Sequence, residues 1–276
     1  MPELPEVEYA ARLARAASAG KVIARVHVLH RAQRRALPGR AARTLAGDTV
    51  VGVDRRGKHQ LVRLASGRTL QVHFRMTGDW RVLTVDDALP STARVALDFD
   101  DGTRLALDDP RALSVVALCE AGVDPCADLG PEANTASFNA DWLAARLAGR
   151  RTAIKVALLD QQLVAGIGNI YASEALWYAR IDPRQPAHRL SDPAHADARR
   201  ALRALAAGVK RALQKALDHP ERYYATGGVS DAVRFNVYDR EGAGCRRCRT
   251  PIARITQAAR STYFCPTCQS PPLPPK

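Results

Sequence analysis

Two pairs of cysteines near the end of the chain constrain its fold more than any other feature. Cys245 and Cys248 form one Cys-x-x-Cys pair, and Cys265 and Cys268 form another after a gap of sixteen residues. Four thiolates at this spacing can surround one Zn²⁺ tetrahedrally, with Zn–S distances of about 2.3 Å. Disulfides or redox motifs are the alternative, but a thioredoxin-type motif stands singly at a strand-to-helix junction. We therefore predict one structural zinc ion bound by all four cysteines, with no coordination position open for catalysis.

The charge of the chain favours a nucleic-acid partner. Its 276 residues include 41 Lys and Arg against 28 Asp and Glu, a formal net charge of +13. This excess is typical of proteins that displace counterions from a phosphate backbone. A genome that enriches Ala and Arg together would give a similar composition, and Ala is abundant here. Charge alone therefore leaves both explanations open. The hydrophobic share of 46% is ordinary for a soluble globular protein of about two domains.

The chain shows no signal for a membrane or for export. No apolar run approaches the roughly 20 residues of a membrane span, and residues 1–6 lack the layout of a signal peptide. We therefore expect a cytoplasmic protein without a membrane partner. Cys119 and Cys126 stand beside apolar residues, which is typical of buried thiols rather than ligands, and no function is assigned to them.

The first half of the chain has the pattern of a helix followed by an antiparallel β-sandwich. A helix is predicted over residues 5–19, with Pro5 in its first turn and Gly20 just beyond its end. Short β-rich runs broken by Gly and Asp follow, and they favour antiparallel strands packed as a sandwich. The predicted strands cover residues 22–29, 49–53, 60–64, 69–74, 80–85, 95–99 and 105–107.

The second half has the pattern of helices. The turn Gly166-Ile167-Gly168-Asn169 would present backbone N–H groups and the Asn169 amide at a helix N-terminus, which suits a phosphate group. Gly227-Gly228 opens a linker to the cysteine module. The predicted helices cover residues 141–147, with Ser137 or Asn139 as the cap, and residues 152–161, 170–179 and 191–218.

Five short motifs stand in order along the chain. They are Met1-Pro2-Glu3-Leu4-Pro5-Glu6-Val7-Glu8, Arg55-Arg56-Gly57-Lys58, Leu158-Leu159-Asp160-Gln161, Gly166-Ile167-Gly168-Asn169-Ile170-Tyr171-Ala172-Ser173-Glu174 and Arg260-Ser261-Thr262. Each is a modest signal alone, but together they make the chain resemble the formamidopyrimidine-DNA glycosylase and endonuclease VIII family of DNA-repair enzymes. The start of the chain is closer to the formamidopyrimidine branch.

The resemblance implies an α+β, multidomain fold. Residues 1–130 would form the catalytic domain, an N-terminal antiparallel β-sandwich with a flanking helix. Residues 131–228 would form a helix-two-turn-helix DNA-binding domain, and residues 229–270 a four-cysteine zinc finger with a β-hairpin. The proline-rich residues 271–276 would be a disordered tail.

The resemblance also implies where the chemistry occurs. The family is understood to use an N-terminal proline amine as nucleophile, which here is Pro2 after removal of Met1. An α-amino group has a pKa near about 7.7–8.0, so a useful fraction is unprotonated at neutral pH. Its attack on C1′ of the sugar gives an iminium ion, an electron sink that permits β- and then δ-elimination. Glu3 would be the general acid-base, Lys58 a proton donor, and Arg260 the finger arginine that clamps phosphate and takes part in δ-elimination.

DNA contacts are implied in the same way. A damaged base lies inside the stack, so the enzyme must flip the nucleotide out and fill the gap. Met76 falls where the family inserts an apolar wedge, and Arg111 falls where an arginine probes the opposite base. Arg150 and Lys155 match basic positions near the lesion and the DNA backbone, and Asn169 ends the phosphate-binding turn. The implied partner is double-stranded DNA containing damaged bases or abasic sites, bound by a monomer.

Most of these assignments have a plainer alternative when each residue is judged alone. Met76 would be a core residue, and Glu6 would either support the site or cap the first helix. The others would be solvated side chains at the chain start, in a hairpin or on a helix face: Pro2, Glu3, Lys58, Arg150 and Lys155.

The chain departs from the formamidopyrimidine branch in three places. Leu113 stands where that branch has a phenylalanine as a second wedge, and leucine stacks poorly on bases. Thr92 stands where the family has a histidine, which puts one DNA contact in doubt. The segment between Gly228 and Val237 is shorter than the loop that closes over 8-oxoguanine. We therefore predict weak or altered excision of 8-oxoguanine, with oxidised pyrimidines or ring-opened purines as better substrates.

The leading hypothesis is a bifunctional DNA glycosylase and AP lyase of base excision repair, associated with the nucleoid. Two rival hypotheses are a catalytically silent DNA-binding protein of the same fold and an RNA-binding zinc-ribbon protein. Pro2, Glu3 and Lys58 are all retained, which argues against a silent protein. An RNA-binding protein would have no reason to hold proline at residue 2.

Overall fold

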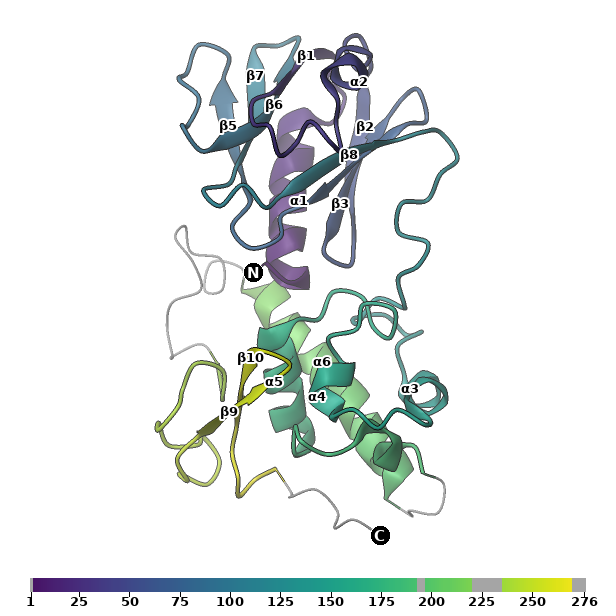
Figure 1. Ribbon diagram of the computed structural model, residues 1–276, viewed down its shortest axis with the longest axis vertical. Helices are drawn as coiled ribbons and strands as arrows, with labels where there is room; N and C mark the ends of the chain where they lie inside the picture. Colours follow the sequence, from purple (N-terminus) through teal and green to yellow (C-terminus); the bar gives the residue numbers. More distant parts are fainter. Residues whose placement is uncertain (1, 193–196, 220–234, 270–276) are drawn as a thin grey trace. The chain divides into compact units, whose positions relative to one another are not determined.

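A computed structural model describes residues 2–192, 197–219 and 235–269 (Figure 1). The chain divides into two compact units, Met1–Ala127 and Asp128–Lys276. The predictions for Met1, for the Gly227-Gly228 linker and for the tail 271–276 lie outside the described residues, as does most of the shortened segment before Val237. None of the described helices is long and apolar enough to cross a membrane.

Two antiparallel sheets form the first unit, which confirms the predicted sandwich. Within residues 2–127, each sheet has four strands, in the orders β1-β6-β7-β5 and β2-β3-β4-β8. The bounds of the first sheet are β1 Ile23–Val28, β5 Asp79–Thr84, β6 Ala93–Phe99 and β7 Thr103–Asp108. Those of the second sheet are β2 Val50–Arg56, β3 His59–Leu64, β4 Thr69–His73 and β8 Val115–Cys119.

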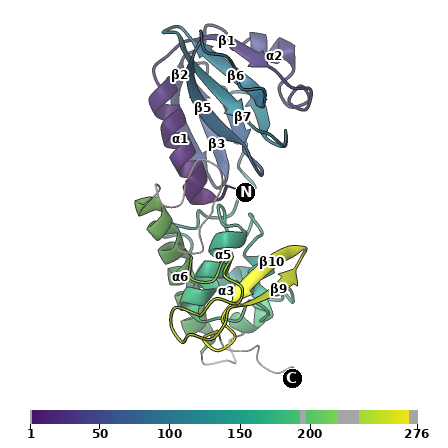
Figure 2. The same cartoon turned by 90° about the vertical axis from the view of Figure 1, so that its left-hand side faces the viewer.

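Helix α1, Leu4–Ser18, packs against the sandwich and contacts β2, β5 and β7 (Figure 2). It begins at a capping box, in which the backbone N–H of Glu3 donates to Glu6 Oε2 at 2.8 Å. The small buried side chains of Ala10 and Ala14 allow close packing in a core that both sheets share. Gly20, with φ at +82°, carries the chain away after the helix. The predicted helix is therefore confirmed, and Glu6 acts as a capping residue, which is one of its two predicted roles.

Two elements of the first unit were not predicted. The short helix α2, Gly39–Arg43, follows Pro38 and buries only Ala42 within it. Strand β8 pairs with β4 from Thr69–Cys119 to His73–Val115 and so completes the second sheet. Its five residues are nearly all apolar, so they lack the alternation of polar and apolar residues that marks a half-buried strand.

The second unit contains the helices α3 Ala140–Leu147, α4 Ile154–Ala157, α5 Asn169–Ala179 and α6 Ala198–Asp218, and the 3₁₀ helix η1 Ala187–Leu190. Asn139 caps α3, because its Oδ1 accepts from the N–H groups of Asp141 at 3.0 Å and Trp142 at 2.9 Å. A Cβ on Gly208 would lie 2.6 Å from the carbonyl oxygen of Ala175, so glycine lets α5 and α6 cross closely.

The helix predicted over residues 152–161 is wrong in length. Helix α4 ends at Ala157, and Asp160 turns the chain by accepting the N–H of Gln162 at its Oδ1 and that of Leu163 at its carbonyl oxygen. The start of α6 at Ala198 also lies later than the predicted residue 191, since η1 and a bend precede it.

A two-stranded hairpin, β9 Ala253–Gln257 and β10 Arg260–Phe264, completes the second unit. Ala258 and Ala259 form its turn with φ at +47° and +59°. This left-handed conformation usually requires glycine or asparagine in a two-residue hairpin turn. Arg260 follows directly and is exposed.

Candidate functional site

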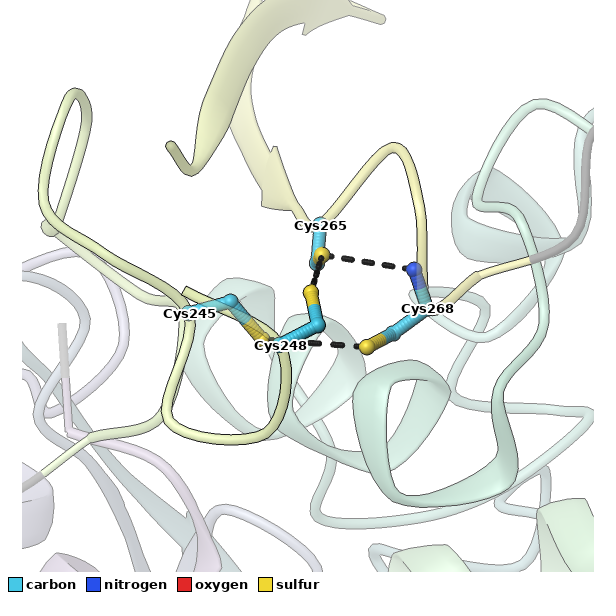
Figure 3. A group of neighbouring side chains, drawn as sticks. All are labelled: Cys245, Cys248, Cys265 and Cys268. Carbon is cyan, nitrogen blue, oxygen red and sulfur yellow. Dashed lines mark hydrogen bonds between the residues drawn. The ribbon is translucent and has the colours of Figure 1, made fainter. Parts of the chain in front are cut away.

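The four predicted cysteine ligands converge in the second unit. Their Sγ atoms all lie within 4.8 Å of one another (Figure 3). Cys245 Sγ lies 3.9 Å from Cys268 Sγ, and Cys248 Sγ lies 3.4 Å from Cys265 Sγ. Four sulfurs at about 2.3 Å from one tetrahedral Zn²⁺ would be separated by about 3.8 Å. The thiols therefore form a site for one structural zinc ion, as predicted.

Two N–H groups favour the thiolate form of Cys245, because their hydrogen bonds lower the pKa of this thiol against the effect of burial. Trp177 Nε1 donates to Cys245 Sγ at 3.5 Å, and the backbone N–H of Arg247 donates to the same sulfur at 3.4 Å. The guanidinium of Arg247 stacks 3.7 Å from the centre of the Trp177 ring and donates to the carbonyl oxygen of Trp177 at 2.6 Å. The metal site is thereby fixed to helix α5, which carries Trp177.

Lys155, Asn169 and the start of β10 meet at the N-terminus of α5. Lys155 Nζ donates to Asn169 Oδ1 and lies 3.4 Å from the carbonyl oxygen of Ser261. Asn169 Nδ2 donates to that same oxygen at 2.9 Å. Lys155 is fully buried, so the alternative of a solvated helix face is wrong for it. These contacts hold the residue next to Arg260 against the phosphate-binding turn that the sequence predicted.

Arg150 does not join this group. It lies in the loop after α3, and its Nη1 forms an ion pair with Asp160 Oδ2 at 2.8 Å. The pair is about one-third exposed on both sides, so it stabilises the protein little. Arg150 is not on a helix face, and its cationic head remains accessible to an anionic ligand.

The proposed catalytic residues of the first unit lie at the start of α1 and in the β2–β3 turn. Pro2 is half-buried, and Glu3 is only 1% exposed. Lys58 follows Gly57 in a two-residue hairpin turn, and it is 7% exposed. The alternatives of a solvated chain start and a solvated hairpin lysine are therefore wrong for Glu3 and Lys58. Burial of a carboxylate and an ammonium group is unfavourable without polar partners, and it is typical of functional sites.

Two exposed loops carry the proposed wedge residues. Met76 is 41% exposed in the β4–β5 loop, and Leu113 is 43% exposed in the β7–β8 loop beside the exposed Arg111. The alternative of a core role for Met76 is therefore wrong. An exposed apolar side chain at a loop tip is suited to insertion between bases.

Asp109 connects these two loops. Its carboxylate is fully buried and accepts from the Thr77 hydroxyl at 2.5 Å and from the backbone N–H groups of Leu113 and Ser114, both at 2.7 Å. Burial alone would raise the pKa of Asp109, but these hydrogen bonds hold it below its usual value. The carboxylate therefore stays ionised at neutral pH and fixes the backbone that carries Leu113.

We expect Asp109→Asn to loosen the Leu113 loop by about 2 kcal/mol, because one carboxylate oxygen that accepts backbone N–H groups becomes an amide donor. Hydrogen exchange at the amides of Leu113 and Ser114 should become roughly thirtyfold faster. The folded-state pKa is depressed, so the wild-type contribution is complete above about pH 4 and is lost only below it. The ratio of the exchange rates in Asp109→Asn and in the unaltered chain should thus be the same at pH 5 and pH 7. The exposed Asp87→Asn is the matched control, and an unchanged exchange rate in Asp109→Asn would contradict the interpretation.

A pair of histidines beside Lys58 was not predicted as part of the site. His59 and His73 are cross-strand neighbours with ring centres 4.6 Å apart. Burial and the nearby charges of Arg75 and Lys58 lower the pKa of His59 to about 4. Burial, His59 and the same two cations lower the pKa of His73 to about 3. Both rings are therefore neutral at physiological pH, and His73 Nδ1 accepts from the backbone N–H of Arg75 at 2.9 Å.

This pair could have been found from the register of the strands. Successive side chains of a strand point to opposite faces of the sheet, and directly paired residues point to the same face. A strand pairing that sets His59 opposite His73 therefore places both rings on one face. The sequence alone does not give that pairing. Of the two cysteines outside the metal cluster, Cys126 is buried as expected, whereas Cys119 is only half-buried; burial raises the pKa of both thiols.

Three family models match successive parts of the chain. The formamidopyrimidine-DNA glycosylase N-terminal domain matches residues 1–116, and the formamidopyrimidine-DNA glycosylase H2TH domain matches residues 129–222. The zinc finger found in FPG and IleRS matches residues 245–271. The matched segments include the start of α1, the turn before α5 and all four cysteines.

Full-length relatives show the same likeness. The formamidopyrimidine-DNA glycosylase of Chloroflexus aurantiacus is 39% identical over 280 residues, which cover 98% of this chain and 98% of the relative. The structure of Lactococcus lactis formamidopyrimidine-DNA glycosylase bound non-covalently to DNA with an AP site matches with a TM-score of 0.85 at 29% identity, covering 98% of this chain and all of that chain. MutM in complex with DNA containing carbocyclic 8-oxo-G matches with a TM-score of 0.87 at 29% identity and the same coverage.

Proposed function

This chain belongs to the formamidopyrimidine-DNA glycosylase family, and from that premise we propose that it is a bifunctional DNA glycosylase and AP lyase of base excision repair. Its substrate would be double-stranded DNA with oxidised or ring-opened bases or abasic sites. The observation that carries the proposal is the buried start of α1, where Glu3 is 1% exposed directly after Pro2. A carboxylate so placed can exchange protons with a group bound at the neighbouring amine.

In the proposed reaction, the Pro2 amine attacks C1′ of the sugar, and the damaged base leaves with a proton. A secondary amine gives an iminium ion with a fixed positive charge, which acidifies the C2′ proton. Loss of this proton expels the 3′ phosphate by β-elimination, and a further elimination expels the 5′ phosphate. Glu3 moves protons during opening of the sugar ring, and Lys58 donates a proton or contacts a phosphate.

The second unit would grip the DNA backbone. Arg260 would clamp a phosphate beside the lesion, and Asn169 and Lys155 would support that grip from the start of α5. Zn²⁺ bound to the four cysteines would hold the hairpin and supply no reactive ligand position.

Met76, Leu113 and Arg111 would fill the gap and contact the opposite base, and Arg150 would contact the backbone.

We further propose the domain division at residues 130, 228 and 270, a monomer gripping one duplex, and a cytoplasmic, nucleoid-associated location. A silent DNA-binding protein of the same fold is the second candidate. The presence of Pro2, Glu3 and Lys58 together, with Glu3 and Lys58 buried, argues against it, because buried ionisable groups are typical of active sites.

Borohydride trapping tests the proposed function. The chain should form a reduced covalent adduct with a duplex that carries one abasic site, and none with the undamaged duplex. Binding to the abasic duplex without an adduct would favour the silent protein. Preferential binding of structured RNA would favour the zinc-ribbon alternative.

Excision of 8-oxoguanine should be slower than excision of an oxidised pyrimidine. Leu113 offers less stacking surface than the phenylalanine of the formamidopyrimidine branch, and a stacking contact is worth roughly 1 kcal/mol. We expect single-turnover rates for 8-oxoguanine at least about fivefold below those for thymine glycol in otherwise identical duplexes. Leu113→Phe is the informative variant. Equal rates for both lesions in the unaltered chain would contradict the prediction.

A further inference from the structure

An ion pair connects helix α1 to strand β2 within the first unit. Glu8 Oε2 lies 2.9 Å from Arg55 Nε, and the two side chains are 19% and 10% exposed. Burial raises the pKa of Glu8, but hydrogen bonds and charges from Arg12 and Arg55 lower it below its usual value overall. The carboxylate is therefore ionised at neutral pH, and the pair is more shielded from salt than an exposed one.

The same arginine reaches the turn that carries Lys58. Arg55 Nη1 donates to the carbonyl oxygen of Gly57 at 3.2 Å. That oxygen belongs to the peptide group that joins Gly57 to Lys58, so its orientation sets the start of the Lys58 backbone. Gly57 has φ at +58°, a left-handed conformation that glycine adopts readily in a two-residue hairpin turn. The planar guanidinium thus uses one N–H group for the helix and another for the turn.

Glu8 also lies on helix α1, which begins directly after Pro2 and Glu3. Helix α1 begins at Leu4, two positions after Pro2, and Glu8 lies four positions further on, or roughly 6 Å along the helix at 1.5 Å per residue. The capping box at Glu3 and Glu6 fixes the first turn of that helix. A capped helical turn therefore connects Glu3, the residue next to Pro2, to Glu8, and Arg55 joins Glu8 to the Lys58 turn.

We propose that Arg55, held by Glu8, is a positioning residue that sets the Lys58 turn relative to the Pro2 end of α1. This inference rests on the proposed glycosylase and lyase function. Arg55 acts through the Gly57 carbonyl and through Glu8, and it is assigned no contact with the reacting atoms. A displacement of about 1 Å between reacting groups can slow a step by roughly a hundredfold.

The chain offers a matched control on the same carboxylate. Arg12 Nε pairs with Glu8 Oε1 at 2.9 Å one helical turn away, and its side chain is 59% exposed. Arg12→Met removes one cationic partner of Glu8 and leaves the contact from Arg55 to Gly57 in place. Arg55→Met removes the hydrogen bonds to both Glu8 and the Gly57 carbonyl oxygen. Arg55→Lys keeps the charge but lacks the planar guanidinium that donates to the two acceptors at once.

The test separates formation of the covalent adduct from binding. Single-turnover rates of borohydride trapping on an abasic duplex are measured at saturating enzyme for the unaltered chain and the three variants. The Kd for a duplex with a tetrahydrofuran abasic analogue is measured alongside. We expect Arg55→Met to slow trapping by about tenfold to a hundredfold with Kd changed by less than about threefold. Arg55→Lys should be intermediate, and Arg12→Met should stay within about twofold of the unaltered chain.

Other outcomes would overturn the inference. Equal trapping by the unaltered chain and Arg55→Met would remove the positioning role while leaving the proposed function intact. Equal losses in Arg55→Met and Arg12→Met would show a general effect of charge on α1. No adduct from the unaltered chain would remove the proposed function and this inference with it. If Arg55→Met does not fold, Glu8→Gln serves instead, because it keeps the side-chain volume and weakens only the ionic contact; unchanged trapping there would contradict the proposal.

Discussion

A chain that retains Met1 will cleave abasic duplex DNA at least about a thousandfold more slowly than the same chain beginning at Pro2. With Met1 in place, the nitrogen of Pro2 is part of a tertiary amide, so it has no lone pair available for attack on C1′. Removal of a covalent nucleophile usually abolishes most of the rate enhancement, and residual activity comes from binding and electrostatics. The measurement is single-turnover strand cleavage, with the N-terminus of each preparation verified by mass spectrometry.

Binding provides the control for this comparison. Both forms should bind a duplex with a tetrahydrofuran abasic analogue with similar Kd, because the proposed backbone contacts of Arg260 and Asn169 lie in the second unit. If the form with Met1 cleaved DNA as rapidly as the form with Pro2 exposed, another group would have to be the nucleophile.

Loss of the zinc ion should have the second largest effect, a strong loss of affinity for abasic duplex DNA. Zn²⁺ in a four-cysteine site contributes on the order of 10 kcal/mol to local folding. The cluster of Trp177, Val237, Ile252 and Tyr263 around Cys245 is too small to hold the hairpin alone. We expect Cys265→Ser to release the metal and to weaken binding of abasic duplex by at least about a hundredfold, because Arg260 loses its fixed position. Fluorescence anisotropy measures the binding of DNA. Metal analysis should find one zinc ion per unaltered chain and none in Cys265→Ser.

Cys119→Ser is the matched control for the zinc prediction. Cys119 lies in β8, outside the metal cluster, so its replacement should change neither the metal content nor the binding of DNA. The sandwich of the first unit should also keep its strands in Cys265→Ser, as circular dichroism can measure. Tight DNA binding by a zinc-free chain would contradict a role for the metal in holding the hairpin.

Local patterns predicted those parts of the fold that local chemistry decides. The spacing of the four cysteines predicted the metal site, since ligand geometry depends on short-range spacing within each pair. Pro5 and Gly20 predicted the first helix, and short β-rich runs broken by Gly and Asp predicted most strands of the sandwich. Sequence patterns did not predict the end of α4 or the existence of β8. Tertiary contacts decide where α4 ends, and pairing with β4 decides whether β8 forms.

Burial was the least predictable property of the site. Judged alone, Lys155 and Lys58 would be solvated and Met76 would be in the core, yet the structure has both lysines buried and Met76 exposed. Such reversals of ordinary burial are expected where binding or catalysis competes with stability. The resemblance to the family identified these positions, whereas the pairing of His59 with His73 required the strand register.

The nitrogen of Pro2 is the expected nucleophile. The most direct test is to trap the covalent intermediate on an abasic duplex with borohydride, digest the protein and locate the modified residue by mass spectrometry. We predict a single modified peptide at the N-terminus, with the sugar fragment attached to the nitrogen of Pro2. Attachment to Nζ of Lys58 or of another lysine would contradict the account.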